Sequence, residues 1–265
     1  MPPRGRIGAV GAAGSPEEWF KSLPPVSKVL ITSLVGSTVL VMLGVIDAYN
    51  LALLWSPLRH KFEIWRLYTN AVFLGAPSFP FLMNLMIFGQ YSIRYEKDAF
   101  DTGGGGGSAD YAWMLAFGMA VLSGLSLAFF VVPFLSIPLM FMIIYVWSRK
   151  VPDVPTSFWG ITVQSVYVPW VMVAFNLLTG ASAFNPLLGI GVGHLYYFLV
   201  DVVPDQFGKD VLTTPAFLTD LFGYGGLNTG VQRFPAPGHA APPRGFPRPG
   251  GGHTWGSGGR PLGTQ

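Results

Sequence analysis

A long stretch without charge is the feature that most constrains how this chain can fold. No Asp, Glu, Lys or Arg occurs from Tyr111 to Ser148. As one helix this stretch would measure about 57 Å at 1.5 Å per residue, nearly twice the hydrocarbon core of a bilayer, which is about 30 Å thick. It must therefore fold back on itself and supply two membrane spans. Residues Val154 to Val200 also lack these charges, so we expect two further spans there.

The overall composition places the chain among membrane proteins. Charged residues make up 11% of it and hydrophobic residues 51%, whereas about a quarter of a soluble domain is charged. The chain has no cysteine, which excludes disulfides, thiolate metal ligands and a cysteine nucleophile. The first apolar run, Val29 to Ile46, is not followed by a small-residue cleavage signature, so we interpret it as a retained first span.

The pattern of apolar runs and charged stops predicts an all-α membrane protein with six spans. The first loop, Asp47 to Pro80, is large, aromatic and too mixed to cross a bilayer freely, so we expect it to lie half-buried at the membrane surface. Gly103 to Gly107 is interpreted as a flexible connector. The spans are expected at about Val29–Ile46, Phe79–Ile93, Tyr111–Phe130, a fourth helix after Pro133 that ends near Lys150, Ser157–Leu178 and Leu187–Val203.

Charge and composition outside the spans predict the topology and the domain limits. Six spans put both termini on one side together with most of the basic residues, and the positive-inside rule then makes that side cytosolic and the first loop luminal. We expect residues 1–14 to be a disordered N-terminus and residues 15–222 to be the six-span domain, which starts with a short interfacial helix. Residues 223–265 are rich in Gly and Pro and are expected to be a disordered cytosolic tail.

Several short sequence patterns follow one another in order from about Trp19 to Phe222. They are Ile64-Trp65-Arg66, Gln90-Tyr91-Ser92 with Arg94 and Glu96, Ala99-Phe100-Asp101, Ala109-Asp110-Tyr111, Tyr145-Val146-Trp147, Ser157-Phe158-Trp159, Tyr167 with Pro169-Trp170, Gly193-His194-Leu195-Tyr196, and Thr214-Pro215 with Phe217-Leu218. In this order they resemble the Derlin family, the rhomboid-like pseudoproteases of endoplasmic-reticulum quality control. The resemblance implies a rhomboid-like bundle of six membrane helices and a role in retrotranslocation, the export of misfolded proteins for ubiquitination and proteasomal degradation.

The resemblance also implies that the Trp65–Arg66 pair in the first loop helps to position substrate and to stabilise the fold. A basic residue on the luminal side runs against the charge bias, which distinguishes this pair from an ordinary interfacial anchor. Short spans, prolines and polar residues at depth fit a lateral cavity that thins the bilayer, although ordinary helix bundles tolerate them as well. The other residues of this candidate path are Asn84, Gln90, Gln164, Asn176 and His194.

An active rhomboid-type intramembrane serine protease is the competing hypothesis. Such an enzyme needs a serine in a Gly-x-Ser setting and a histidine base two spans later. Counting back from Tyr145 places the nucleophile at Ser136, which lacks the motif glycine and is expected to bond a backbone carbonyl. The base would fall on Pro186, which cannot transfer a proton. His194 lies about 80° round the helix from that site and is either a packing histidine or a polar group in a membrane cavity. We therefore expect no protease activity.

Two further motifs concern packing and partners. Gly189-x-x-x-Gly193 is typical of helices that approach closely through small residues. Near the C-terminus, residues 251–263 resemble the box by which some Derlins bind the AAA unfoldase called valosin-containing protein, but Gly259 stands where an aromatic residue is usual. The alternative is a low-complexity tail with a chance tryptophan. The candidate unfoldase-binding residues are Trp255, Gly256, Gly258, Arg260 and Leu262.

No cofactor, metal ion or nucleic-acid partner is expected, because there is no phosphate loop and the four histidines are scattered. A small-solute channel or transporter would show an acidic ring or an inverted repeat, and neither is seen. The partners implied by the resemblance are misfolded polypeptides, the AAA unfoldase, a membrane-embedded ubiquitin ligase complex and the lipid bilayer. The sequence leaves open whether the chain acts alone, as a homo-oligomer or as half of a channel completed by the ligase.

Overall fold

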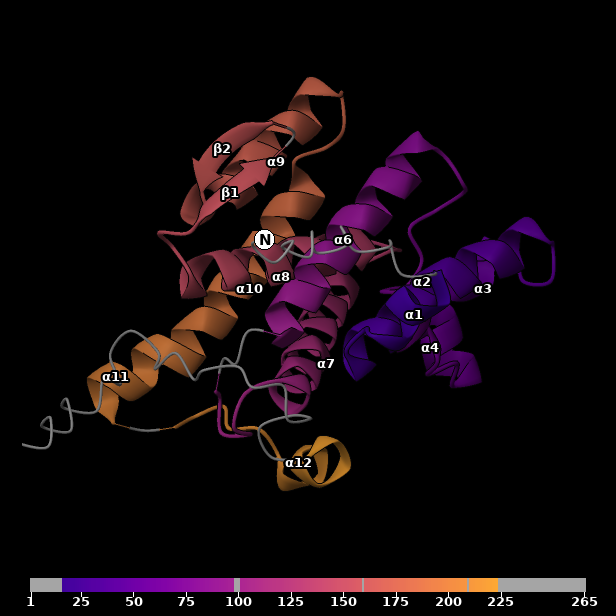
Figure 1. Cartoon of the computed structure of the whole chain (residues 1–265). Coiled ribbons are helices and arrows are strands. Elements are labelled where there is room, and N and C mark those ends of the chain that lie inside the picture. Colours follow the sequence, from indigo (N-terminus) through magenta and orange to yellow (C-terminus); the bar gives the residue numbers. More distant parts are fainter. Residues whose placement is uncertain (1–15, 98–100, 159, 209, 224–265) are drawn as a thin grey trace, which may run out of the picture.

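The computed structural model describes residues 16–97, 101–158, 160–208 and 210–223, and it is mostly helical (Figure 1). This confirms the predicted helical class. Three of the described helical stretches are long and apolar enough to cross a membrane, and they cover residues 25–42, 108–130 and 184–207. The other three predicted spans fall on helices that are shorter or less apolar, so the total of six stays a prediction.

The described part of the chain begins with two helices, α1 (Pro16–Lys21) and α2 (Pro25–Met42). Proline is well suited to the first turn of α2, because the missing N–H would have no partner there. One face of α2 is buried at three- and four-residue spacing and consists of Ser27, Leu30, Leu34 and Thr38. The predicted end of the first span at Ile46 is wrong, because the helix stops at Met42 and Gly44 turns the chain with φ +70°.

The predicted first loop contains three short helices, α3 (Ala48–Leu51), α4 (Trp55–Lys61) and α5 (Arg66–Thr69). The Asp47 carboxylate caps α3 by accepting the Tyr49 N–H at 2.8 Å. Two backbone bonds dock the loop onto the start of a later helix: Leu53 N–H to Pro133 O at 2.8 Å, and Leu135 N–H to Asn70 O at 3.0 Å. The loop is therefore an ordered part of the fold.

The second and third predicted spans correspond to α6 (Phe79–Lys97) and α7 (Ser108–Leu125). α6 starts where the second span was predicted to start and continues one turn beyond Ile93. α7 continues through a π-helical turn, η1 (Ser126–Phe130). The Ser126 hydroxyl closes this end by bonding both the N–H and the carbonyl of Val132, so the helix ends at Phe130 as predicted.

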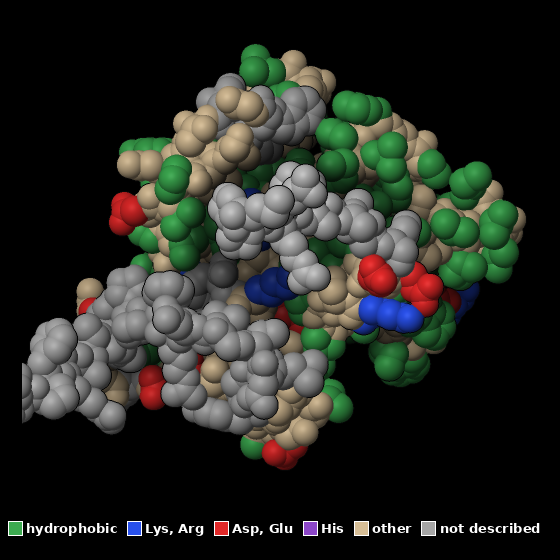
Figure 2. All heavy atoms as spheres, viewed as in Figure 1, with side chains coloured by type: hydrophobic (Ala, Val, Ile, Leu, Met, Phe, Trp, Pro, Cys, Tyr) green, Lys and Arg blue, Asp and Glu red, His purple; other side chains and the backbone are tan. Residues whose placement is uncertain are grey.

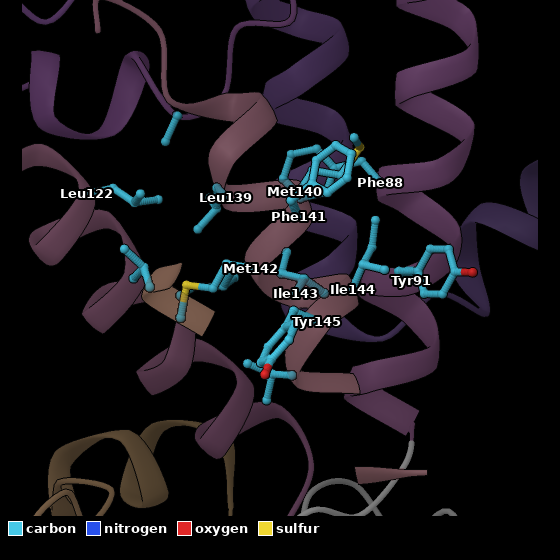
Figure 3. Close-up of a cluster of buried hydrophobic side chains, with 14 of the residues drawn as sticks. Phe88, Tyr91, Leu122, Leu139, Met140, Phe141, Met142, Ile143, Ile144 and Tyr145 are labelled. Atoms are coloured by element: carbon cyan, nitrogen blue, oxygen red, sulfur yellow. The ribbon is translucent and has the colours of Figure 1, made fainter. Parts of the chain in front are cut away.

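α8 (Ser136–Lys150) is the central helix of the molecule. It packs against α6, α7, α9 and, most extensively, α10. Its residues from Leu139 to Trp147 are at most 3% exposed. Figure 3 shows side chains of α8 between those of α6 and α7. A helix that is apolar on every side is expected at such a buried position.

The predicted fifth span, Ser157–Leu178, is wrong in its first half. A β-hairpin replaces it, with β1 (Pro155–Phe158) antiparallel to β2 (Ile161–Gln164), and the helix comes only afterwards as η2 (Ser165–Tyr167) and α9 (Val168–Leu178). β-branched residues at 156 and 161–163 favour strands. Gly160 has φ +85° in the two-residue turn, where glycine is favoured.

The last long helical stretch consists of α10 (Phe184–Tyr197), η3 (Phe198–Val202) and α11 (Val203–Phe207). The predicted sixth span, Leu187–Val203, lies inside it. A short helix, α12 (Ala216–Phe222), follows near α7. Figure 2 shows hydrophobic side chains over large parts of the visible surface. Such a surface suits a chain whose exposed faces meet lipid.

Candidate functional site

Arg66 holds the first loop together from the inside. Its side chain is 2% exposed, and its Nη1 donates to the carbonyls of Tyr49 at 2.5 Å and Ala52 at 2.7 Å. Its Nε donates to the Glu63 carboxylate at 2.5 Å. The guanidinium therefore ties the end of α3 to the start of α5. The neighbouring Trp65 differs, because 54% of its side chain is exposed.

The same loop closes over the N-terminus of α8. The Asn70 side-chain amide donates to the Arg66 carbonyl, and Asn70 itself is fully buried. Ser136, the first residue of α8, donates from its hydroxyl to the Phe73 carbonyl at 2.7 Å. The bond to a backbone carbonyl that the sequence predicted for Ser136 is confirmed. This hydroxyl serves to join the loop to α8.

The structure places His194 far from Ser136. The His194 Nδ1 bonds the Tyr145 hydroxyl at 2.8 Å. Tyr145 follows Ser136 by nine residues on α8, which corresponds to about 13 Å along the helix axis. The predicted base position is occupied by Pro186, which is buried in the first turn of α10. The serine and the histidine are therefore not arranged as a nucleophile and its base.

Gly189 and Gly193 face α8 at backbone contact distance. A Cβ atom on Gly189 would lie 2.1 Å from the Pro138 carbonyl oxygen, and one on Gly193 would lie 3.1 Å from that of Met142. The two contacts advance by four residues on both helices, so α8 and α10 run parallel here. Only a residue without a side chain allows this approach at Gly189.

The segment Gly103 to Gly107, predicted to be a flexible connector, is an ordered loop folded around a carboxylate. The Asp110 side chain, 1% exposed, accepts N–H bonds from Thr102 at 3.3 Å, Gly104 at 2.9 Å and Gly106 at 2.7 Å. Asp101 likewise accepts N–H bonds from Gly103 and Gly105. The prediction failed because it treated glycine as a source of freedom only, whereas here the backbone N–H groups converge on two acids.

This glycine loop also holds the C-terminal end of the described chain. The Thr214 hydroxyl donates to the Asp110 carboxylate, and the Thr214 N–H donates to the Thr102 carbonyl at 3.1 Å. Thr214 directly precedes the proline before α12. We call this group of Thr102, Asp110 and Thr214 the threonine clasp. It joins residues more than one hundred positions apart in the sequence.

A second buried carboxylate joins three helices at the same end of the molecule. Glu96, 4% exposed on α6, accepts the N–H groups of Val26 at 2.9 Å and Ser27 at 2.6 Å, which lie in the first turn of α2. It also accepts the Ser108 hydroxyl of α7 at 2.6 Å. A helix N-terminus stabilises a negative charge, so Glu96 acts as a cap supplied from another helix.

Sequence reasoning did not select Glu96 and Asp110 as site residues. Both stand in the patterns that resemble the Derlin family, and both are acids next to an apolar run, where a buried charge needs a specific partner. Their partners are backbone N–H groups and hydroxyls, which carry no charge signal in the sequence. The available signals were these patterns and the position of both acids at predicted helix ends.

The predicted polar path residues lie on separate elements. Asn84 and Gln90 belong to α6, Gln164 ends β2, and Asn176 lies on α9. Asn176 donates to the Met172 carbonyl of its own helix at 2.9 Å. Within the described ranges, no hydrogen bond joins one of these four side chains to another, so they do not form a single polar centre.

The predicted unfoldase-binding residues, Trp255, Gly256, Gly258, Arg260 and Leu262, lie outside the described residues. The same holds for residues 1–14 and for nearly all of the predicted tail. Among the residues that the structure does describe, no group of three or more histidines and acids could hold a metal ion.

Comparison with known proteins gives consistent matches over most of the chain. Residues 23–216 match the model of the Der1-like family. Derlin-1 of Arabidopsis thaliana is 38% identical over 209 residues, which cover 78% of this chain and 77% of that protein. Derlin-1 of Oryza sativa subsp. japonica is 39% identical over 206 residues, which cover 77% and 84%. Derlin-2.2 of Arabidopsis thaliana is 37% identical over 217 residues, which cover 78% and 87%.

Proposed function

The chain belongs to the Der1-like, or Derlin, family, and from that premise we propose that it is a membrane component of endoplasmic-reticulum-associated degradation. In this proposal it forms, or contributes to, the path by which misfolded polypeptides leave the endoplasmic reticulum. The match to the Der1-like family over residues 23–216 is the observation that carries the proposal, because it includes α2 to α11 and both ends of the threonine clasp.

The proposed role does not use protease chemistry. Ser136 is bonded to the Phe73 carbonyl, His194 is bonded to Tyr145, and a proline occupies the position of the base. Serine catalysis needs the hydroxyl within hydrogen-bond reach of a base. We therefore propose a pseudoprotease. If cleavage of a rhomboid reporter is detected and is lost on Ser136→Ala, the protease alternative takes its place.

The proposed topology is six spans with both termini in the cytosol. The N-terminus of α2 and the C-terminus of α6 meet at Glu96, so both lie at one end of the bundle. Arg94, Lys97, Arg149 and Lys150 lie on the last turns of α6 and α8. This accumulation of basic residues favours the cytosolic side for that end. The first loop, which contains Arg66, then faces the lumen.

Several short elements support a path through a thinned bilayer. α8 has 15 residues and α9 has 11, while a spanning helix needs about 20. Short helices are accommodated by local thinning of the bilayer. We propose that Trp65, exposed at the luminal loop, contacts the substrate and that Arg66 keeps the loop in place. Asn84, Gln90, Gln164, Asn176 and His194 remain candidates for the polar path.

The proposed partners follow from the same role. They are misfolded polypeptides, a ubiquitin ligase complex in the membrane, further copies of the chain, and the AAA unfoldase bound through Trp255 and Leu262. A pull-down of the unfoldase by the full-length protein tests the last partner. Binding that is unchanged in the Trp255→Ala, Leu262→Ala double variant would exclude this box as the site.

A degradation assay tests the central proposal. In cells that lack their own Derlins, expression of this chain should restore the degradation of a misfolded luminal reporter, measured as its half-life. Trp65→Ala should slow degradation several-fold. Trp55→Ala is the matched control, because that tryptophan lies in the same loop and is similarly exposed, 56% against 54%. Failure of the unaltered chain to shorten the half-life would refute the role.

A further inference from the structure

Arg149 has a cationic group whose described partners are all neutral. Its Nε donates to the Tyr145 hydroxyl at 3.0 Å, and its guanidinium carbon lies 5.2 Å from the centre of the Tyr145 ring. The ion pairs seen between two described residues are Lys21–Glu17, Arg66–Glu63 and Lys150–Asp201, none of which includes Arg149. Within the part of the chain that the structure describes, no residue accepts a hydrogen bond from the terminal N–H groups of Arg149, so they can bind an anion.

The Tyr145 hydroxyl contacts His194 as well as Arg149. It accepts the Arg149 Nε–H and also bonds His194 Nδ1, 2.8 Å away, as donor or as acceptor according to the tautomer of the imidazole. In the tautomer that accepts the Tyr145 proton on Nδ1, the imidazole carries its own proton on Nε2. His194 is exposed, so in that tautomer the Nε2–H is a second donor near the arginine.

His194 lies on an otherwise apolar exposed stripe of α10. The other exposed residues of this stripe recur at helical spacing and are Phe184, Leu187, Gly191, Leu195 and Phe198. The stripe belongs to residues 184–207, one of the stretches long enough to cross a membrane. A polar N–H that faces hydrocarbon is costly unless an acceptor meets it.

The depth of these two donors matches the boundary between lipid tails and headgroups. Lys150, the residue after Arg149, bonds Asp201 at 2.5 Å and so marks the charged end of the α8–α10 pair. His194 lies about two turns before Asp201 on the same helical stretch. Arg149 is thus level with the charged end, and His194 is deeper, toward the apolar stripe.

We propose that Arg149 and His194 bind one membrane phospholipid. The terminal N–H groups of Arg149 bind the phosphate oxygens, and the His194 Nε2–H binds an ester carbonyl deeper in the lipid. The acyl chains lie along the apolar stripe of α10. Lys150 is paired with Asp201, so of these two neighbouring basic residues of α8 it is Arg149 whose charge matches the single negative charge of a phosphodiester. Tyr145 is the positioning residue that orients both donors. This proposal rests on the membrane location of the chain and is independent of the proposed role in degradation.

Native mass spectrometry of the full-length protein in detergent tests the site. The probe is dioctanoylphosphatidylglycerol, titrated to count bound molecules and to obtain a Kd. Arg149→Gln should weaken binding of the first molecule about tenfold, the effect of losing one charge-assisted interaction. Lys97→Gln, which removes an exposed cation at the same end, should leave the Kd within about twofold. Equal weakening by both variants would show general charge attraction and overturn the site.

Two further ligands separate the parts of the lipid. Dioctanoylglycerol, which lacks the phosphate, should bind at least tenfold more weakly, and inorganic phosphate should not displace the lipid at millimolar concentration. If the diglyceride binds equally well, the stripe holds acyl chains alone and the Arg149 assignment is wrong. If phosphate displaces the lipid completely, the site takes a free anion and the proposal of a phospholipid fails.

Two histidine variants and one arginine variant guard against a folding effect. His194→Gln keeps an acceptor for Tyr145 and an outward N–H, so it should bind nearly as well as the unaltered protein, whereas His194→Phe should bind more weakly. If Arg149→Gln does not fold, Arg149→Lys decides, because it keeps the charge and loses the planar fork. An unchanged Kd for the lipid in Arg149→Lys or in His194→Phe would contradict the proposed geometry.

Discussion

Two glycine-rich segments of this protein use opposite properties of the same residue. In the α8–α10 contact, Gly189 and Gly193 serve because they lack a side chain, so that two helix backbones touch. In the glycine loop, the backbone itself is the functional group: its N–H groups surround Asp101 and Asp110, and four of its five glycines have positive φ. Glycine content alone therefore does not distinguish a packed helix, an ordered loop and a flexible connector.

The largest expected effect comes from Gly189→Ala. The new Cβ would lie 2.1 Å from the Pro138 carbonyl oxygen, which is backbone and cannot turn away. The two helices would have to separate, and we expect a loss of about 3 kcal/mol or more of stability. Thermal unfolding of the purified protein in detergent measures this. Gly191→Ala on the same helix is the control, because its Cβ would meet nothing within 4 Å.

Asp110→Asn should have the next largest effect and should act on a different part of the chain. The amide offers one acceptor oxygen in place of a carboxylate that takes the N–H bonds of the glycine loop and the Thr214 hydroxyl. Leaving buried donors unpaired costs about 1–3 kcal/mol. Limited proteolysis should show faster cleavage in residues 208–223. If cleavage there is unchanged, Asp110 does not hold this segment.

Gly104→Ala tests whether the glycine loop also needs the absence of a side chain. The added Cβ would lie 2.5 Å from the Asp110 carboxylate oxygen. We expect a loss of about 1–2 kcal/mol, because the Asp110 side chain can shift only by weakening its own bonds. The proteolysis pattern should resemble that of Asp110→Asn. A pattern like that of Gly189→Ala would instead mean that the two glycine segments are not independent.

Gly193→Ala should have the smallest effect of the four. Its Cβ would lie 3.1 Å from the Met142 carbonyl oxygen and 3.2 Å from the Tyr145 ring, distances that a shift of a few tenths of an ångström relieves. We expect about 1 kcal/mol of destabilisation in the same thermal unfolding measurement. A loss of stability as large as that of Gly189→Ala would show that both glycine contacts, and not the one at Gly189 alone, determine how closely α8 and α10 approach.

The parts of the fold that the sequence predicted well depend on local chemistry. The third predicted span ends at Phe130, where η1 ends, and the second starts at Phe79, as does α6, because apolar runs and their stops are visible in the sequence. Ser136 was expected to bond a backbone carbonyl because the glycine and the base that a nucleophile needs are missing from their positions.

The failures have two causes, the limits of hydropathy as a signal and partners that are distant in the sequence. The fifth span was predicted from hydropathy, which does not separate the strand-forming residues 155–164 from the helix that follows. Glu96 and Asp110 were passed over because their partners, the first turn of α2 and Thr214, lie about 70 and 104 positions away. A sequence read in short windows contains no sign that these groups meet.

The threonine clasp also determines which helix first bears a pulling force that is applied to the C-terminal segment. Tension applied to the chain beyond Phe222 reaches Thr214 before it reaches α11 and α10. The bonds of Thr214 to Asp110 and Thr102 must break before that tension can pass further back along the chain. While they hold, the pull is delivered to the first turn of α7, beside the Glu96 junction with α2 and α6. Such a load therefore has to break the bonds of the clasp before it can pull on residues 184–207, the last stretch long and apolar enough to cross a membrane.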